Sequence, residues 1–238
     1  MIDKVFEMYR DIKLGNNEIC KKCKEFHESI NCGLYGPASL WNVGNKYETD
    51  QYKVMFVGKP ARGLPGKETD YGFLDCRECG LKLYNEKGWP YWNYTKEIAK
   101  RLYGSAEEGW NRIAFTNIIK CNNSYDVDTA TYEMKKYCID ELGVIWKEIA
   151  VLKPKNVIFY THWYYDDFID RFMLGDHYKD ITDRHHWIPN GSKKMSWWHR
   201  EFYNEGQLVM RMLRTAHPER QKKEEFVNRI VDWVKAVI

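Results

Sequence analysis

The run FTNIIKC at residues 115–121 decides how this chain is expected to fold. With the apolar residues just before it, the run predicts a buried strand over residues 113–119. A long helix is predicted over residues 129–152, and it carries Cys138. Cys121 closes the run itself, so the two cysteines flank a strand-to-helix junction.

Two further cysteines, Cys20 and Cys23, form a C-x-x-C near the start of the chain. Four thiols drawn from two distant segments favour a metal site over disulfides in a reducing compartment. The total of seven cysteines is odd, which argues against a fully paired secreted framework. The first residues are charged and lack an apolar signal region, so a cytoplasmic location is expected.

The composition predicts a packed globular protein. The 238 residues are 44% hydrophobic and 30% charged, and no apolar stretch is long enough to cross a bilayer. A net charge of +3 neither indicates nor excludes nucleic-acid binding, because a basic face can hide in a balanced total. Aromatic residues reach 16%, which fits either an aromatic core or a pocket that stacks on flat ligands.

The order of the predicted elements indicates an α/β fold. Strands are predicted over residues 53–57, 113–119, 156–160 and 208–213, with helices between and after them. This alternation predicts a three-layer α/β/α sandwich around a four-stranded, mainly parallel sheet. We expect one domain over residues 1–238, with an N-terminal segment over 1–50 and an insertion over 63–87. Residues 1–30 of the N-terminal segment are predicted to be helical.

Three motifs lie at or directly after the ends of predicted strands. GKPARG at residues 58–63 follows the first strand, Asn117 lies in the second, and TAHP at residues 215–218 follows the last. A fourth segment, GWPYW at residues 88–92, precedes a predicted helix. Ligands of open α/β sheets bind beyond the carboxyl ends of the strands, so we expect the motifs to line one cleft.

Together the motifs and cysteines resemble the iron–sulfur (family four type) branch of the uracil-DNA glycosylase superfamily. The run at residues 116–121 is similar almost residue for residue to the family's Thr-Asn-Val/Ile-Val-Lys-Cys, and His217-Pro218 to its His-Pro. The first loop departs from the family, since Lys59 stands where an acidic residue is usual. The resemblance extends roughly over residues 20–218.

The resemblance implies a 4Fe–4S cluster that ties the N-terminal segment to the sheet. Its four thiolate ligands would be Cys20, Cys23, Cys121 and Cys138. The residues themselves leave a second possibility open, because Cys76 and Cys79 form another C-x-x-C. With the first C-x-x-C, that pair would make a tetrathiolate zinc site.

The resemblance also assigns roles within the pocket. Asn117 would read the edge of the base, and His217 would stabilise the departing base anion. The loop at Gly58 and Lys59 would hold the sugar and the attacking water. Tyr91 takes the position of the ring that stacks on the flipped base, and Phe73 competes for that position.

The implied activity is that of a monofunctional DNA glycosylase. It would flip out uracil or a modified pyrimidine and hydrolyse the N-glycosidic bond, leaving an abasic site. Two alternatives remain open, a glycosylase for a bulky cytosine such as glycosylated hydroxymethylcytosine in phage DNA, and a catalytically silent DNA-binding module. We expect a monomer that contacts DNA through Arg62, Lys67, Lys193, Lys194, Arg214 and Arg220.

Overall fold

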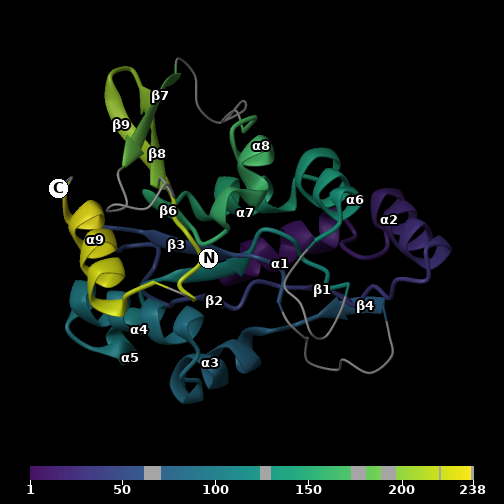
Figure 1. The fold of residues 1–238 in the computed structure, drawn as a ribbon, viewed down its shortest axis with the longest axis horizontal. Helices are drawn as coiled ribbons and strands as arrows, with labels where there is room; N and C mark the ends of the chain where they lie inside the picture. The colour runs from purple at the N-terminus through teal and green to yellow at the C-terminus, as the bar shows by residue number, and fades with distance from the viewer. Residues whose placement is uncertain (62–70, 124–129, 173–180, 189–196, 220, 237–238) are drawn as a thin grey trace. The chain divides into compact units, whose positions relative to one another are not determined.

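The computed structural model describes residues 1–61, 71–123, 130–172, 181–188, 197–219 and 221–236 (Figure 1). It has an α/β fold, with a mixed sheet and helices. The chain divides into two compact units, which are described separately. The first unit comprises Met1–Trp41, Gly58–Leu81 and Thr116–Leu152, and the second Asn42–Val57, Lys82–Phe115 and Lys153–Ile238.

In the first unit, the predicted helical start forms two helices, α1 (Ile2–Asp11) and α2 (Glu18–Ser29). Asn17 caps α2, because its side-chain oxygen accepts a hydrogen bond of 2.8 Å from the Cys20 N–H. Strands β1 (Gly36–Ala38) and β4 (Tyr71–Leu74) form a small parallel sheet, and α3 (Arg77–Glu86) follows. Residues 71–86, within the predicted insertion, therefore form regular structure.

The predicted long helix over residues 129–152 is divided into three parts. These are α6 (Tyr132–Lys135), the π-helical turn η1 (Lys136–Glu141) and α7 (Val144–Leu152). Gly143 lies between η1 and α7 with φ of +64°, a left-handed conformation that glycine adopts most easily. Buried residues continue on both sides of this break, so hydrophobic periodicity alone does not reveal it.

Most of a seven-stranded sheet belongs to the second unit, and its strands follow the order β2-β5-β3-β6-β9-β8-β7. The four predicted strands lie side by side at its centre as β5, β3, β6 and β9, but the predicted four-stranded sheet is wrong, since β2, β8 and β7 extend it. The strands are β2 (Asn42–Val43), β3 (Val54–Gly58), β5 (Ala114–Asn117), β6 (Asn156–Phe159), β7 (Ile181–Ile188), β8 (Trp197–Asn204) and β9 (Gln207–Arg214). The last residues of β3 and β5, Gly58 and Thr116–Asn117, belong to the first unit.

Strand β8 was missed because a charged side chain occupies one of its interior positions. Arg200 is 3% exposed, and its guanidinium donates to the backbone oxygens of Ile169 (2.9 Å) and Phe172 (3.3 Å). These bonds satisfy the buried charge, which would otherwise be very costly. The alternation of apolar and polar residues that marks a strand is therefore broken at a core position.

Strands β3, β6 and β9 run parallel, so their carboxyl ends lie at one edge. All residues of β3 are buried, as expected of a parallel strand covered on both faces. Helix α4 (Pro90–Tyr103) packs against α5 (Ala106–Trp110) and α9 (Lys223–Lys235). The short helices η2 (His162–Tyr165) and α8 (Asp166–Ile169) follow β6 (Figure 1).

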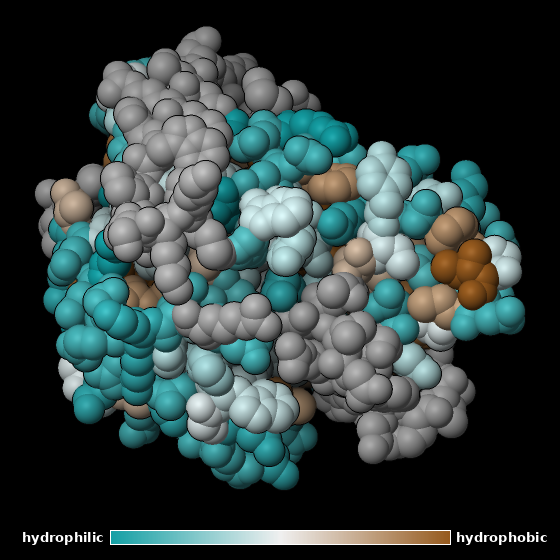
Figure 2. All heavy atoms as spheres, in the orientation of Figure 1, coloured by the Kyte–Doolittle hydropathy of each residue, from teal (hydrophilic) through white to brown (hydrophobic). Residues whose placement is uncertain are grey.

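The face shown in Figure 2 is largely hydrophilic, with hydrophobic side chains gathered near the end of α2. Ile30, directly after that helix, is 50% exposed. In the described part of the chain, no helix combines the length and apolar character needed to cross a membrane.

We expect the protein to lose stability at alkaline pH. Burial raises the pKa of Tyr9, Tyr84 and Tyr160 above the ordinary value of 10.0. Because these pKa values are higher in the folded state than in the unfolded state, the contribution of the neutral hydroxyls to stability is full below about pH 10. It is lost as the pH rises further, since the unfolded chain then releases these protons more readily. These three rings alone should lower the free energy of unfolding by about 4 kcal/mol near pH 11. Burial also raises the pKa of Tyr103 and of the thiols of Cys23, Cys76 and Cys138, which add to the loss.

Urea unfolding followed at a series of pH values around 10 would measure this loss. Tyr160→Phe removes one titrating hydroxyl and should make the loss near pH 11 smaller by about 1.4 kcal/mol. A decline of unchanged steepness in that variant would mean that the loss has another origin.

Candidate functional site

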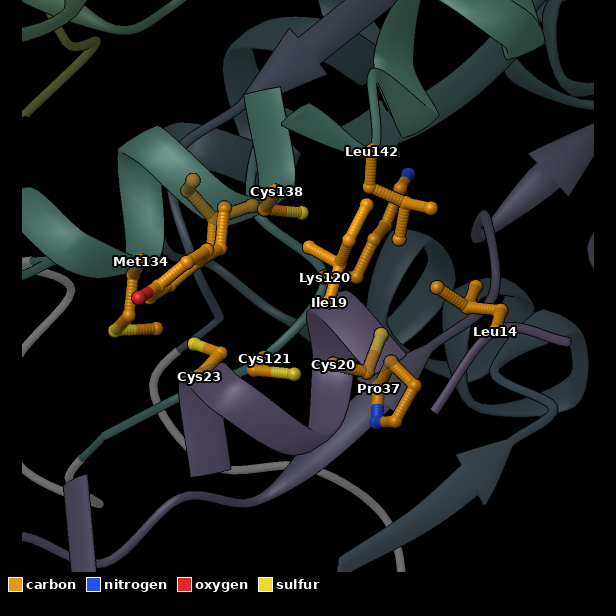
Figure 3. Close-up of a pocket in the computed structure, with 12 residues that line it drawn as sticks. Leu14, Ile19, Cys20, Cys23, Pro37, Lys120, Cys121, Met134, Cys138 and Leu142 are labelled. Carbon is orange, nitrogen blue, oxygen red and sulfur yellow. The ribbon is translucent and has the colours of Figure 1, made fainter. Parts of the chain in front are cut away.

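One cavity in the first unit brings together the four cysteines that the resemblance assigns to a cluster. Cys20, Cys23, Cys121 and Cys138 all line it, and we call it the cysteine cavity (Figure 3). In Figure 3, Cys138 approaches from one side, and the other three cysteines lie opposite it. Most of the remaining lining is apolar: Leu14, Ile19, Pro37, Ile119, Met134 and Leu142.

Local structure explains how each thiol reaches the cavity. Cys20 and Cys23 lie one turn apart on α2, so both project from the same face. Cys121 enters from the run that follows β5, and Cys138 lies within the π-helical turn η1. Such turns occur often at functional sites. In the described part of the chain, none of the four is paired in a disulfide.

The electrostatics of the cavity keep the thiols of Cys23 and Cys138 protonated at neutral pH. Burial, together with the nearby Cys138 and Cys20, raises the pKa of Cys23 to about 12. Burial likewise raises the pKa of Cys138 to about 11, although the backbone N–H and the charge of Lys120 oppose this. Among the described residues, no group of three or more His, Cys, Asp or Glu side chains is arranged to hold a metal ion.

The donor chemistry nevertheless fits an iron–sulfur cluster. The described donors that line the cavity are thiols with apolar neighbours, and backbone N–H groups reach the sulfurs, which is typical of such sites. The Gly15 N–H, for example, donates to the Cys20 sulfur at 3.4 Å. The cysteines of the second C-x-x-C, Cys76 and Cys79, do not line this cavity. The alternative zinc site therefore stays a prediction.

Gly15 is required by the geometry of the cavity wall. Its φ is +91°, and a Cβ added there would lie only 2.9 Å from Cδ of Pro37. We expect Gly15→Ala to destabilise the fold through both backbone strain and this clash. Gly104→Ala is the matched control, because Gly104 has φ of +89° but open space around a Cβ.

Urea unfolding gives the free energy of unfolding of each variant, and the difference between the two values measures the cost of the clash with Pro37. This cost should be about 1–3 kcal/mol. The displaced Gly15 N–H should also lower the amount of iron bound per chain. Equal destabilisation of the two variants would show that Pro37 yields without cost.

A buried polar network that sequence reasoning missed supports one wall of the cavity. Lys120 and Glu148 form an ion pair of 2.6 Å at 1% and 0% side-chain exposure. The Lys120 ammonium also donates to the Thr116 hydroxyl, which donates to the other Glu148 oxygen at 3.0 Å. The Tyr9 hydroxyl donates to Glu148 and accepts from the Leu40 N–H at 3.1 Å. The network joins α1, α7 and the run before Cys121.

His27 forms a second buried connection, between α2 and α6. Its Nδ1–H donates to the Cys23 carbonyl oxygen at 2.7 Å. The Thr131 hydroxyl, 2.9 Å away, donates to Nε2 of His27, and Thr131 also caps α6. The helix with the C-x-x-C is thereby fixed to the helical segment that leads to Cys138. The i, i+4 spacing from Cys23 was the available sequence signal.

The first two motifs meet in the first unit. Asn117 is the last residue of β5 and is 5% exposed. The N–H of the next residue, Ile118, donates to the Gly58 carbonyl oxygen at 2.8 Å. Gly58 ends β3, and Lys59 follows it, half-buried. The loop at residues 58–59 is therefore adjacent to Asn117, whereas Arg62 lies outside the described residues.

In the second unit, His217 lies beside Tyr91. The two rings are nearly parallel, at 7°, with centroids 5.7 Å apart. The Glu219 N–H donates to Nδ1 of His217 at 3.3 Å, which leaves the Nε2–H of the neutral ring as a donor. Tyr91 also contacts Phe115 at 5.1 Å. His217 follows β9 at the edge where the parallel strands end.

Phe73 and Arg214 have surroundings that differ from their predicted roles. Phe73 packs on Phe6 and Tyr9, with centroids 6.0 and 5.6 Å away, as part of an apolar contact with α1. Arg214 is 4% exposed and holds Asp166 at 2.6 Å, which does not fit a phosphate contact. The other predicted DNA contacts lie outside the described residues: Arg62, Lys67, Lys193, Lys194 and Arg220.

Comparison of the chain with protein-family models and with curated proteins finds no match. Membership of the uracil-DNA glycosylase superfamily therefore stays a prediction from the motifs.

Proposed function

We propose that this protein is a monofunctional DNA glycosylase that hydrolyses the N-glycosidic bond of a flipped pyrimidine nucleotide. The substrate class is uracil or a modified pyrimidine, and the product is an abasic site. The chain would act on DNA as a monomer in the cytoplasm.

One observation carries the proposal. The run after Asn117 contacts the first motif at its start, through Ile118 and Gly58, and reaches the cysteine cavity at its end through Cys121. The Ile118–Gly58 hydrogen bond continues the pairing of the neighbouring strands β5 and β3, and Cys121 brings the same run to the cysteine cavity. Both connections join segments that lie far apart in the sequence, and both agree with what the resemblance implies.

The chemistry assigns one task to His217. When water attacks the anomeric carbon, the C–N bond breaks and its electron pair stays on the base as an anion. The proton that the attacking water loses passes through solvent to this anion, which leaves as the neutral base. The Nε2–H of His217 would donate a hydrogen bond to the anion as it forms, which lowers the barrier most if the donor is already oriented. The Glu219 N–H at 3.3 Å provides that orientation by occupying Nδ1.

Asn117 and Tyr91 would hold the base. A side-chain amide offers both a donor and an acceptor to the Watson–Crick edge of a pyrimidine, so it can match uracil or cytosine by rotation. An aromatic ring such as Tyr91 supports the face of a flipped base. The acid usual at position 59 is replaced by Lys59, so the water would be held by backbone groups of that loop.

The cysteine cavity would hold the 4Fe–4S cluster through Cys20, Cys23, Cys121 and Cys138. When bound, the cluster would supply a covalent link between α2 and the segment after β5. The residues around it fix the strand end that carries Asn117 and take no part in bond cleavage.

A panel of oligonucleotides tests the proposal, with uracil, hypoxanthine, thymine mismatches or modified cytosines at one position. Excision would be scored by alkaline cleavage at the abasic site. Asn117→Ala, prepared in parallel, excludes a contaminating glycosylase, because it should leave the product band absent. DNA that binds but loses no base from any panel member would contradict the proposal.

The panel also decides between the two alternatives. Excision confined to glycosylated hydroxymethylcytosine would identify a glycosylase acting in defence against phage. The loop at Lys59 favours this alternative, since it departs from the family where the sugar and water are held. Binding without excision would identify a silent DNA-binding module.

A further inference from the structure

Two neighbouring aromatic residues on the surface of the second unit have no role in the proposed reaction. Trp163 and Tyr164 lie in the turn η2, directly after β6, and are 60% and 50% exposed. Their ring centroids are 4.5 Å apart at an angle of 38°. The His162 ring lies 5.1 Å from that of Tyr164. We call the first two residues the Trp163–Tyr164 platform.

The backbone holds this platform in a conformation that carries strain. His162 has φ of +57°, which is uncommon for a residue other than glycine and costs roughly 1–3 kcal/mol. The His162 N–H donates to the Thr215 carbonyl oxygen at 3.1 Å, which fixes the turn to the end of β9. Thr161 and Tyr165, on either side, are buried at 0% and 1% exposure.

A second attachment follows the turn. Asp166 accepts from the Arg214 guanidinium at 2.6 Å and from the Trp198 indole N–H at 3.2 Å. Arg214 lies in β9, the strand next to β6, and Trp198 lies in β8, which pairs with β9. The ion pair with the buried Arg214 therefore fixes the turn to the sheet. The rings of Trp163 and Tyr164 are exposed to solvent on a turn that is held in place.

The position of the platform connects it with the proposed site. Thr215, to which the turn is bonded, precedes His217 by two residues. The turn and the His217 segment thus leave neighbouring parallel strands at the same edge of the sheet. Ligands of such sheets bind at this edge.

The charges nearby favour a base rather than a phosphate as the bound group. Asp167 and Asp170 are exposed on the segment after the platform, as is Arg171, so carboxylates outnumber cations there. A phosphate would be repelled by this balance. The faces of the two rings, in contrast, can stack on any nucleobase, because every base has a π-face.

We propose that the Trp163–Tyr164 platform stacks on an unpaired nucleobase of DNA outside the pocket that receives the excised base. This inference rests on the proposed function, since it takes DNA as the ligand. It predicts that part of the affinity for single-stranded DNA depends on bases rather than on the charge of the backbone.

Two strands of equal length and charge provide the test, one with normal bases and one made only of abasic deoxyribose phosphates. Fluorescence anisotropy of an end-labelled strand would give the Kd for each. The double variant Trp163→Ala/Tyr164→Ala should bind the base-bearing strand about 10- to 100-fold more weakly and the abasic strand as wild type does. The double variant Trp163→Phe/Tyr164→Phe should keep the wild-type Kd.

Tyr132→Ala is the matched control, because Tyr132 is 62% exposed but lies on α6 in the first unit. It should change neither Kd. An equal loss on both strands would show that the rings contact the backbone, and no loss on either would show that they do not contact DNA; each result overturns the proposal.

The experiment separates the platform from the proposed function because it requires no excision. Base-dependent binding without excision of any panel base would support the proposed stacking on the platform and contradict the proposed glycosylase activity. Excision, combined with binding that is equally strong with and without bases, would support the glycosylase activity and contradict the proposed stacking on the platform.

Discussion

Glu148→Leu should be among the most destabilising single substitutions in the chain, lowering the free energy of unfolding by about 3–5 kcal/mol. The Glu148 side chain is fully buried, and it holds the ammonium of Lys120 at 2.6 Å. Without the carboxylate, the Lys120 charge remains in the interior with only the Thr116 hydroxyl as a hydrogen-bond acceptor in this network. Urea unfolding of the purified variant measures the loss.

A double variant distinguishes a lost charge partner from lost packing. Lys120→Met/Glu148→Leu removes both charges and replaces them with apolar groups of similar size, so it should recover most of the stability. The double variant should also bind iron nearly as wild type does, since the stem of residue 120 still lines the cysteine cavity. If the losses of the two single variants simply add in the double variant, the two residues are not coupled.

The features predicted correctly from the sequence are those that local patterns encode. Apolar runs located β3, β5, β6 and β9, because buried parallel strands appear as continuous hydrophobic stretches. The placement of three cysteines likewise depends on a few adjacent residues. The spacing of Cys20 and Cys23 puts both on one helical face, and Cys121 follows directly after a strand. The resemblance then named Cys138, which local patterns could not supply and which lines the same cavity.

The features that were missed depend on partners far away in the sequence. Glu148 appears as a surface charge in its own helix, and only the contact with Lys120 explains its burial. The burial of Arg200, which conceals the strand pattern of β8, also depends on distant partners. Its guanidinium donates to the carbonyl oxygens of residues 169 and 172. The sequence pattern also does not predict the π-helical turn around Cys138, because buried residues continue through it at nearly helical spacing.

His217→Ala should slow excision by about 10²- to 10³-fold, while the Kd for DNA stays close to that of wild type. The reason is that the ring would contact the leaving base only as negative charge develops on it. The Glu219 N–H binds Nδ1 at 3.3 Å, so the neutral ring has its proton on Nε2. Single-turnover excision and anisotropy binding, measured on the same oligonucleotide, give the two quantities.

The choice of leaving base makes this prediction specific. The anion of 5-fluorouracil is intrinsically more stable than that of uracil, so a donor that stabilises the anion matters less for it. The defect of His217→Ala should therefore shrink on DNA that carries 5-fluorouracil. His217→Gln, which still offers an N–H donor, should recover part of the rate on uracil. A defect of equal size on both bases would mean that His217 only supports Tyr91, the ring parallel to it at 5.7 Å.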